Sequence, residues 1–153
     1  MLAVALQSWV TRQPRTWLSP ESDRTGLAPG AVSVLVVDDD RGVRRLTARM
    51  LRTGGYKVLE AESGAEALRT LEGDPEVRLL VTDIVMPVMD GLVLADRAVA
   101  KLPRLRVVLM TGHAPELTTK LDHRDSRLPV LLKPFTAEQL LGKVRDTLAG
   151  TEH

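Results

Sequence analysis

The chain has 153 residues, enough for one domain with a hydrophobic core, and its 44% hydrophobic and 27% charged residues are typical of a globular protein. The net charge of +1 gives no reason to expect nucleic acid or a membrane as a direct partner, and the absence of cysteine excludes disulfides, thiolate metal sites and cysteine nucleophiles. No apolar run approaches the roughly 20 residues of a membrane span and no secretory signal is evident, so we expect a cytoplasmic protein.

Residues 1–32 differ from the rest of the chain. They contain several prolines and glycines and no strand pattern, although a few apolar side chains near their start share one helical face. We therefore expect a flexible or partly helical extension here. A domain from 33 to 150 and a tail at 151–153 would complete the chain.

Five short apolar runs predict β-strands. They are rich in valine and leucine on consecutive positions, which suits parallel strands that are covered on both faces. The predicted strands are residues 34–37, 57–61, 77–82, 106–110 and 130–132.

Helical periodicity fills three of the connections and follows the last strand. The signals that bound these helices are Gly54-Gly55 after the first, a capping box of Ser63 and Glu66 before the second, Pro103 after the third, and a capping box of Thr136 and Gln139 before the last. The connection at 112–129 is poorly patterned and predicts a weak helix at best.

The alternation of strands and helices predicts the fold class. Such a pattern favours an α/β protein with a parallel sheet and right-handed connections. Five strands in a domain of this length suit a flavodoxin-like, doubly wound sheet with strand order 2-1-3-4-5 and helices on both faces.

Polar residues follow four of the predicted strands. Asp38 and Asp39 follow the first strand, Asp83 the third, Thr111 the fourth and Lys133 the fifth. Ligands of open parallel sheets bind outside the carboxyl ends of the strands, where the strand order reverses. We therefore expect these side chains to converge on one crevice.

This set of residues fits one kind of chemistry. Three neighbouring carboxylates repel one another, and a divalent cation such as Mg2+, which prefers oxygen ligands, removes that penalty. A carboxylate beside the metal is a nucleophile toward phosphorus, while a lysine and a hydroxyl stabilise phosphoryl oxygens. The set therefore fits the formation of an aspartyl phosphate.

Taken singly, each residue also has an ordinary structural explanation. The acidic run could be a solvated loop in which Asp40 caps the next helix. Asp83 and Thr111 would suit turns, and Lys133 would suit an exposed surface. Their shared placement at successive strand ends favours a site.

Four motifs stand at the strand ends: VLVVDD at 34–39, DIVMPVMDG at 83–91, MTG at 110–112 and LKPF at 132–135. With these motifs in this order, the chain from 33 to about 150 resembles the receiver domain of bacterial two-component response regulators. The sequence around the predicted acceptor is also similar to that of receivers attached to hybrid histidine kinases.

The resemblance implies a role for each site residue. Asp83 would accept the phosphoryl group and, with Asp39, ligate Mg2+ directly. Asp38 would bind the metal through water, and the backbone carbonyl of Val85 would be a further ligand. Lys133 would pair with the phosphoryl group.

The resemblance also implies that Thr111 moves toward the phosphoryl group on activation, and that the Lys133-Pro134 peptide bond is cis. The family often has Tyr or Phe where this chain has Val130. A switch based on an aromatic hydroxyl is therefore absent.

The implied partners are a sensor histidine kinase or a histidine phosphotransfer protein, with an unknown protein downstream. The chain would not be an enzyme in the usual sense, because it would catalyse only its own phosphorylation and dephosphorylation. Only a few residues follow the last predicted helix, so we expect a single-domain regulator whose output goes through a non-covalent partner, onward phosphotransfer or feedback on a kinase. A homodimer is a further option.

Two other functions stay open. Asp38-Asp39-Asp40 matches the D-x-D motif of haloacid-dehalogenase phosphatases, although Gly42 stands where that motif wants Thr or Val and the motif at Asp83 stays unexplained. A phosphorylation-independent binding module on the same fold is the second alternative.

Overall fold

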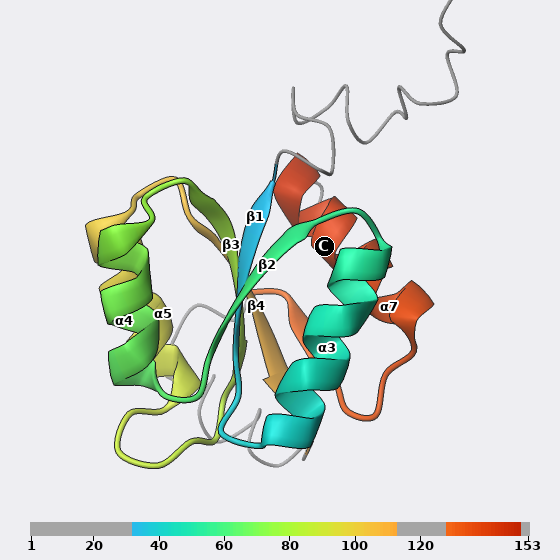
Figure 1. The fold of residues 1–153 in the computed structure, drawn as a ribbon, viewed down its shortest axis with the longest axis horizontal. Coiled ribbons are helices and arrows are strands. Elements are labelled where there is room, and N and C mark those ends of the chain that lie inside the picture. The colour runs from blue at the N-terminus through green and yellow to red at the C-terminus, as the bar shows by residue number, and fades with distance from the viewer. Residues whose placement is uncertain (1–31, 113–127, 151–153) are drawn as a thin grey trace, which may run out of the picture.

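The computed structural model describes residues 32–112 and 128–150. Its five strands and four helices carry the labels of Figure 1. The strands are β1 Ser33–Val37, β2 Lys57–Ala61, β3 Val77–Asp83, β4 Arg106–Thr111 and β5 Val130–Leu132. The helices are α3 Arg41–Thr53, α4 Gly64–Gly73, α5 Gly91–Lys101 and α7 Ala137–Ala149.

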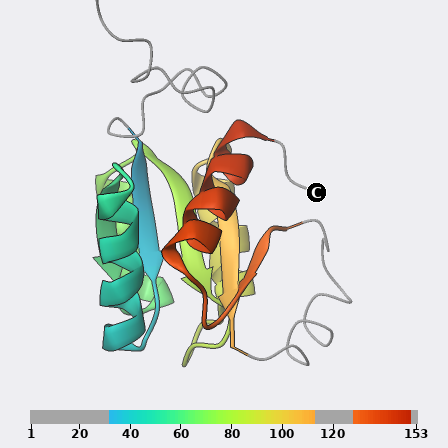
Figure 2. The same ribbon diagram turned by 90° about the vertical axis from the view of Figure 1, so that its right-hand side faces the viewer.

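The strands form one parallel sheet in the order β2-β1-β3-β4-β5. The prediction of a flavodoxin-like α/β fold is therefore confirmed. Helices cover both faces, with α4 and α5 on one side and α3 and α7 on the other (Figures 1 and 2). Because the order reverses between β1 and β3, the crevice expected at this switch point lies beyond Val37 and Thr82, which are register partners.

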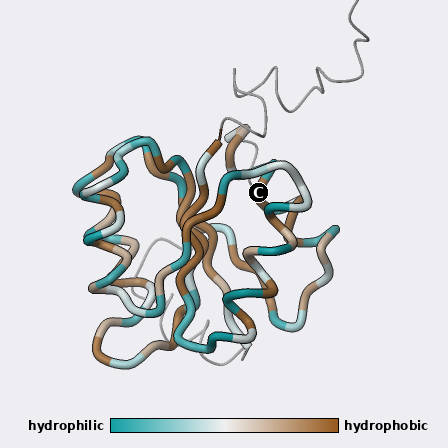
Figure 3. The backbone as a smooth tube through the Cα atoms, in the orientation of Figure 1, coloured by the Kyte–Doolittle hydropathy of each residue, from teal (hydrophilic) through white to brown (hydrophobic). Residues whose placement is uncertain are grey.

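Alternating side chains of each strand fill two separate cores. Leu35 and Val37 of β1 pack on the side of α4 and α5, whereas Val34 and Val36 pack on the side of α3 and α7. All four side chains are completely buried, and Figure 3 shows the hydrophobic strands gathered at the centre. This two-sided burial explains why the strand reads as an unbroken apolar run.

The helix boundaries follow the predicted caps, with one difference. The chain leaves α3 at Gly54, and Gly55 adopts a positive φ of 99° that favours glycine. The capping box of Thr136 and Gln139 at the start of α7 is complete. Before α4, the Ser63 hydroxyl accepts from the backbone N–H of Glu66, but the Glu66 carboxylate accepts from Glu62 instead of Ser63.

The structure differs from the predicted strand ends by one residue. β3 and β4 continue to Asp83 and Thr111, so both residues belong to the sheet and not to the loops beyond it. Val32 is 2% exposed and its carbonyl accepts from the backbone N–H of Lys57, so the domain packing includes this residue. No helix within 32–112 and 128–150 is long and apolar enough to cross a membrane.

Three predictions concern segments outside the described residues. They are the extension up to residue 31, most of the connection at 112–129, and the tail at 151–153.

Candidate functional site

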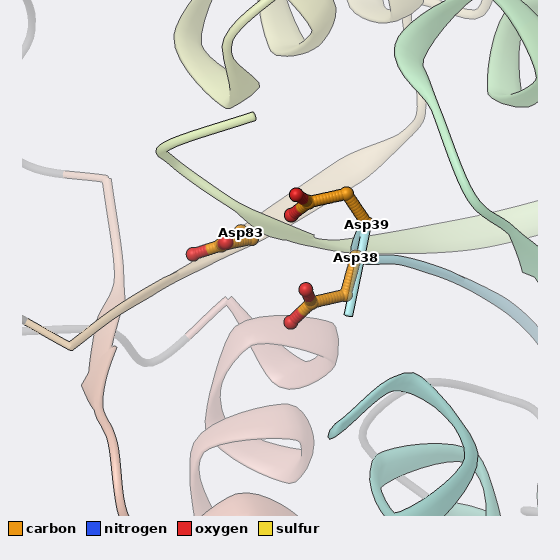
Figure 4. Close-up of side chains that lie close together, drawn as sticks. All are labelled: Asp38, Asp39 and Asp83. Atoms are coloured by element: carbon orange, nitrogen blue, oxygen red, sulfur yellow. The ribbon is translucent and has the colours of Figure 1, made fainter. Parts of the chain in front are cut away.

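Three aspartates meet at the carboxyl end of the sheet. Asp38 and Asp39 leave β1, and Asp83 is the last residue of the neighbouring strand β3 (Figure 4). One carboxylate oxygen from each lies within 4.8 Å of the others. Asp38 is 0% exposed and Asp83 is 8% exposed, whereas Asp39 is open to solvent. The structure therefore brings together the three carboxylates that the sequence predicted.

Hydrogen bonds with β2, with α3 and with the loop between β1 and α3 fix the position of Asp38. Its N–H donates to the carbonyl of Ala61 at the end of β2, at 3.3 Å, and its side chain accepts from the N–H of Asp40 at 2.9 Å. The Arg44 guanidinium of α3 donates to the Asp38 carbonyl oxygen at 3.0 Å. Hydrogen bonds therefore fix the conformation of the acidic loop at Asp38, and the loop is not a freely solvated turn.

Lys133 enters the site from the end of β5. Its Nζ lies 2.8 Å from Asp38 Oδ2 and 3.3 Å from Asp83 Oδ1, so it pairs with both buried carboxylates. Its backbone N–H donates to the carbonyl of Thr111 at 2.8 Å, which ties β5 to the end of β4. The bond from Lys133 to Pro134 is cis, as the resemblance implied.

The surroundings of Asp83 favour its protonated form. Burial raises its pKa to about 6, and the neighbouring charges of Asp38 and Asp39 add to the effect, while Lys133 opposes it. Burial acts to lower the pKa of Lys133, but its hydrogen bonds and charge contacts with Asp38 and Asp83 outweigh burial and raise that pKa. One ammonium therefore balances the three carboxylates only in part.

The loop after Asp83 lies tightly against the strand. A methyl group on Gly91 would overlap the carbonyl of Asp83, so only glycine allows this approach. The Gly91 N–H donates to the Ile84 carbonyl at 2.7 Å, and Asp90 caps the start of α5. Between these fixed points Val88 is fully exposed and has a φ of 70°, which is unusual for a β-branched residue.

The other predicted residues take three different positions. Thr111 is completely buried at the end of β4, beside β5. Val85 lies two residues past Asp83 in the loop and is 45% exposed. Asp40 caps α3 by accepting from the N–H of Val43, which is the structural role weighed for it above.

The donor set suits a hard divalent cation. Its atoms are carboxylate oxygens, and Mg2+ is bound in proteins through one or two carboxylates together with water and phosphate oxygens. Asp39 points an exposed carboxylate into the cluster (Figure 4). Burial raises the pKa of Asp83, and the charges of Asp38 and Asp39 add to the effect, so a bound cation would favour the ionised carboxylate. The three aspartates therefore fit Mg2+.

Sequence reasoning missed one part of the site. Arg44 and Glu60 lie just below the acidic loop, where Arg44 Nε is 3.4 Å from Glu60 Oε1. Arg44 follows Asp38 by six residues on an arginine-rich helix, and Glu60 lies in a predicted strand. Neither carries a local motif, because their meeting depends on how α3 packs over β2.

Comparisons with known proteins agree with this geometry. The sequence model of one protein family, the response regulator receiver domain, matches residues 34–145 of this chain. The response regulator receiver protein CpdR of Brucella abortus is 36% identical over 115 residues, which cover 75% of this chain and 95% of CpdR. A solved response regulator receiver protein from Sinorhizobium medicae is 31% identical, with a TM-score of 0.69, over 80% of this chain and 98% of that one.

A second relative is much longer than this chain. The sensor kinase CckA of Brucella abortus is 36% identical over 120 residues, which cover 78% of this chain but only 13% of the kinase. The similarity therefore concerns one part of that kinase. The family match covers most of the chain, and the parallel sheet and the acidic cluster agree with it, so the chain belongs to the receiver domain family of two-component response regulators.

Proposed function

We propose that this receiver domain accepts a phosphoryl group on Asp83, with Mg2+ bound beside it, and passes the signal on by a change of conformation. The observation that carries the proposal is the cluster of Asp83 with two further carboxylates and the Lys133 ammonium at one strand-end crevice. The family supports it, because receiver domains act in two-component signalling.

The proposed metal ligands all come from β1 and β3 and the loops after them. They are the carboxylates of Asp38, Asp39 and Asp83 and the backbone carbonyl of Val85. When bound, Mg2+ supplies positive charge that neutralises the carboxylates and phosphoryl oxygens. It would also leave Asp83 ionised, which a nucleophile requires.

The transfer is a displacement at phosphorus. An Asp83 oxygen attacks the phosphoryl group of a phosphohistidine, and the new O–P bond forms as the P–N bond breaks. The electron pair stays on the imidazole nitrogen of the donor, which takes a proton from solvent. Lys133 would leave its pairing with Asp83 to contact a phosphoryl oxygen, because the phosphoryl group carries the larger negative charge.

The signal would spread through Thr111. Its hydroxyl is buried at the end of β4, and its backbone holds Lys133. A hydrogen bond from this hydroxyl to the phosphoryl group would pull on β4 and β5 together and shift a pre-existing equilibrium between two conformations. Val130 of β5 offers no hydroxyl, so this route does not use an aromatic side chain.

The proposed donor is a sensor histidine kinase or a histidine phosphotransfer protein in the cytoplasm, and the recipient of the signal is a further protein. Two relatives support a donor and recipient of these kinds, because the CckA relative is named a sensor kinase and the CpdR relative a response regulator receiver protein.

The test is the mass of the intact protein after incubation with acetyl phosphate. We expect one phosphoryl adduct on the wild-type chain in the presence of Mg2+, and none after chelation with EDTA. Asp83→Asn should remove the adduct, whereas Asp40→Asn, which alters only the helix cap, should keep it.

A folded wild-type protein that gains no adduct from acetyl phosphate or from a phosphohistidine donor would contradict the proposal. That result would favour the phosphorylation-independent module. An adduct that persists in Asp83→Asn would instead move the acceptor to another residue.

A further inference from the structure

Arg44 connects the acidic loop to the second strand. Its Nη1 donates to the carbonyl oxygen of Asp38 at 3.0 Å, while its Nε lies 3.4 Å from Glu60 Oε1. The Arg44 side chain is only 13% exposed and that of Glu60 is 24% exposed. The planar guanidinium thus makes two directed contacts from one fixed position, which a lysine could not reproduce.

Glu60 is itself held from a second direction. Arg52, two turns further along α3, donates to Glu60 Oε2 at 3.3 Å and to the Val58 carbonyl at 3.0 Å. The Glu60 carboxylate is therefore clamped between two arginines of one helix. This arrangement fixes Glu60, and through it the orientation of Arg44.

The contact at Asp38 matters because of what else Asp38 does. Its side chain pairs with Lys133 and accepts from the N–H of Asp40, so every polar group of this residue has a partner. The main chain of Asp38 also determines the position of the next residue, the exposed Asp39. A shift of the Asp38 carbonyl therefore moves both carboxylates relative to Asp83.

We propose that Arg44, oriented by Glu60, is a positioning residue that holds Asp38 and Asp39 in the arrangement that binds Mg2+. The inference rests on the proposed function, because it assumes that Mg2+ binds at these carboxylates. Second-sphere contacts of this kind orient metal ligands without touching the metal.

The charge of Arg44 and its positioning role predict opposite changes in Mg2+ affinity when the side chain is lost, so the direction of the change tests the inference. A guanidinium near a cation site repels the cation, so removal of its charge should strengthen Mg2+ binding if charge were its only influence. Positioning predicts weaker binding. An open pocket of about 390 Å3 is lined by Arg44 and Glu60, so water can fill the space that a lost guanidinium leaves, and the loop need not unfold.

The experiment is a calorimetric titration of the full chain with MgCl2. Arg44→Met keeps the aliphatic part of the side chain and removes the donors and the charge. We expect its affinity for Mg2+ to fall about tenfold, the lower end for loss of a second-sphere contact. Arg44→Lys keeps the charge but not the paired contacts, and we expect about a threefold loss.

Arg49→Met is the matched control. It removes an exposed arginine from the same helix, and this arginine forms no hydrogen bond or ion pair with Glu60 or with the acidic loop. We expect its Mg2+ affinity to stay within about twofold of wild type, because its charge is more distant and exposed to screening. Thermal unfolding of each variant without Mg2+ reports whether it folds.

Affinity equal to or tighter than wild type in Arg44→Met would overturn the inference and leave the proposed function standing. If Arg44→Met does not fold, unchanged affinity in Arg44→Lys would overturn it equally. No Mg2+ binding by the wild-type chain would overturn the inference together with the metal part of the proposed function.

Discussion

In the middle of the sheet, β1 places Val34, Leu35, Val36 and Val37 out of reach of water, and Asp38, the first residue after the strand, is buried just as completely. The two regions are consecutive along the chain and equally buried but have opposite chemistry. The apolar stretch gains free energy from burial, about 1.5–3 kcal/mol for each large side chain. The aspartate loses hydration and needs partners to offset that loss.

The two regions contribute differently to stability and to the chemistry of the site. The two apolar cores supply stability, and Lys133, Arg44 and backbone amides make a set of buried charges tolerable at the strand ends. Within the described residues, every buried polar side-chain atom has a hydrogen-bond partner. Substitutions in the two regions should therefore have opposite effects on stability.

The largest effect is expected in the apolar region. Leu80 of β3 is completely buried between β1 and β4, so Leu80→Ala should lower the free energy of unfolding by about 3 kcal/mol, from lost burial and the cavity left behind. Urea denaturation followed by circular dichroism measures the change. Val99→Ala, on an exposed surface of α5, is the control and should change stability by about 0.5 kcal/mol or less.

At the boundary between the regions, Gly91→Ala should cost about 2 kcal/mol, because the added methyl group meets the Asp83 backbone, which cannot rotate away. The same urea titration tests it. Gly73→Ala, where an added methyl group meets nothing within 4 Å, is the matched control and should not destabilise the protein. Equal stability of the two variants would show that the loop after Asp83 can shift to accommodate the methyl group at little cost in free energy.

In the acidic region we expect removal of the Asp83 charge to increase the stability of the folded chain. The pKa of Asp83 lies at about 6 in the folded chain and at 3.8 ordinarily, so the folded state holds this proton more tightly than the unfolded state. Its contribution to stability is then complete below about pH 4 and is lost as the pH rises through about 6. The full shift corresponds to about 3 kcal/mol, and solvent screening at the crevice reduces the expected effect to about 1–2 kcal/mol.

Asp83→Asn should therefore be more stable than wild type at pH 8 without Mg2+, and the two should converge as the pH approaches 4. Thermal unfolding at several pH values measures this difference. Addition of Mg2+ should stabilise the wild type and not the variant. A variant that is less stable at pH 8 would contradict the electrostatic description of the site.

The smallest effect concerns Val88. Its φ of 70° costs an L-residue about 1–2 kcal/mol, and its exposed side chain has no packing to lose. Val88→Gly removes the strain but adds freedom to the unfolded chain at a cost of about 0.5–1 kcal/mol. We expect a net gain of about 0.5 kcal/mol in urea denaturation. A loss would mean that the valine side chain stabilises the loop.

The same contrast explains what the sequence predicts. The strands can be predicted because two-sided burial leaves unbroken apolar runs such as 34–37 and 77–82. The site can be predicted because the polar residues Asp38 and Asp83 end these runs. The pairing of Arg44 with Glu60 depends on how a helix lies over a strand. The positive φ of Val88 depends on a loop held at both ends, and a valine gives no signal for it.

The central claim is that Asp83, among three clustered carboxylates, carries the phosphoryl group. The most direct measurement is reduction of the acetyl phosphate-treated protein with borohydride, which converts an acyl phosphate to an alcohol, followed by peptide mass mapping. We predict homoserine at position 83 and unchanged aspartate at 38 and 39. Homoserine at either of those positions, or at none in a protein that binds Mg2+, would contradict the account.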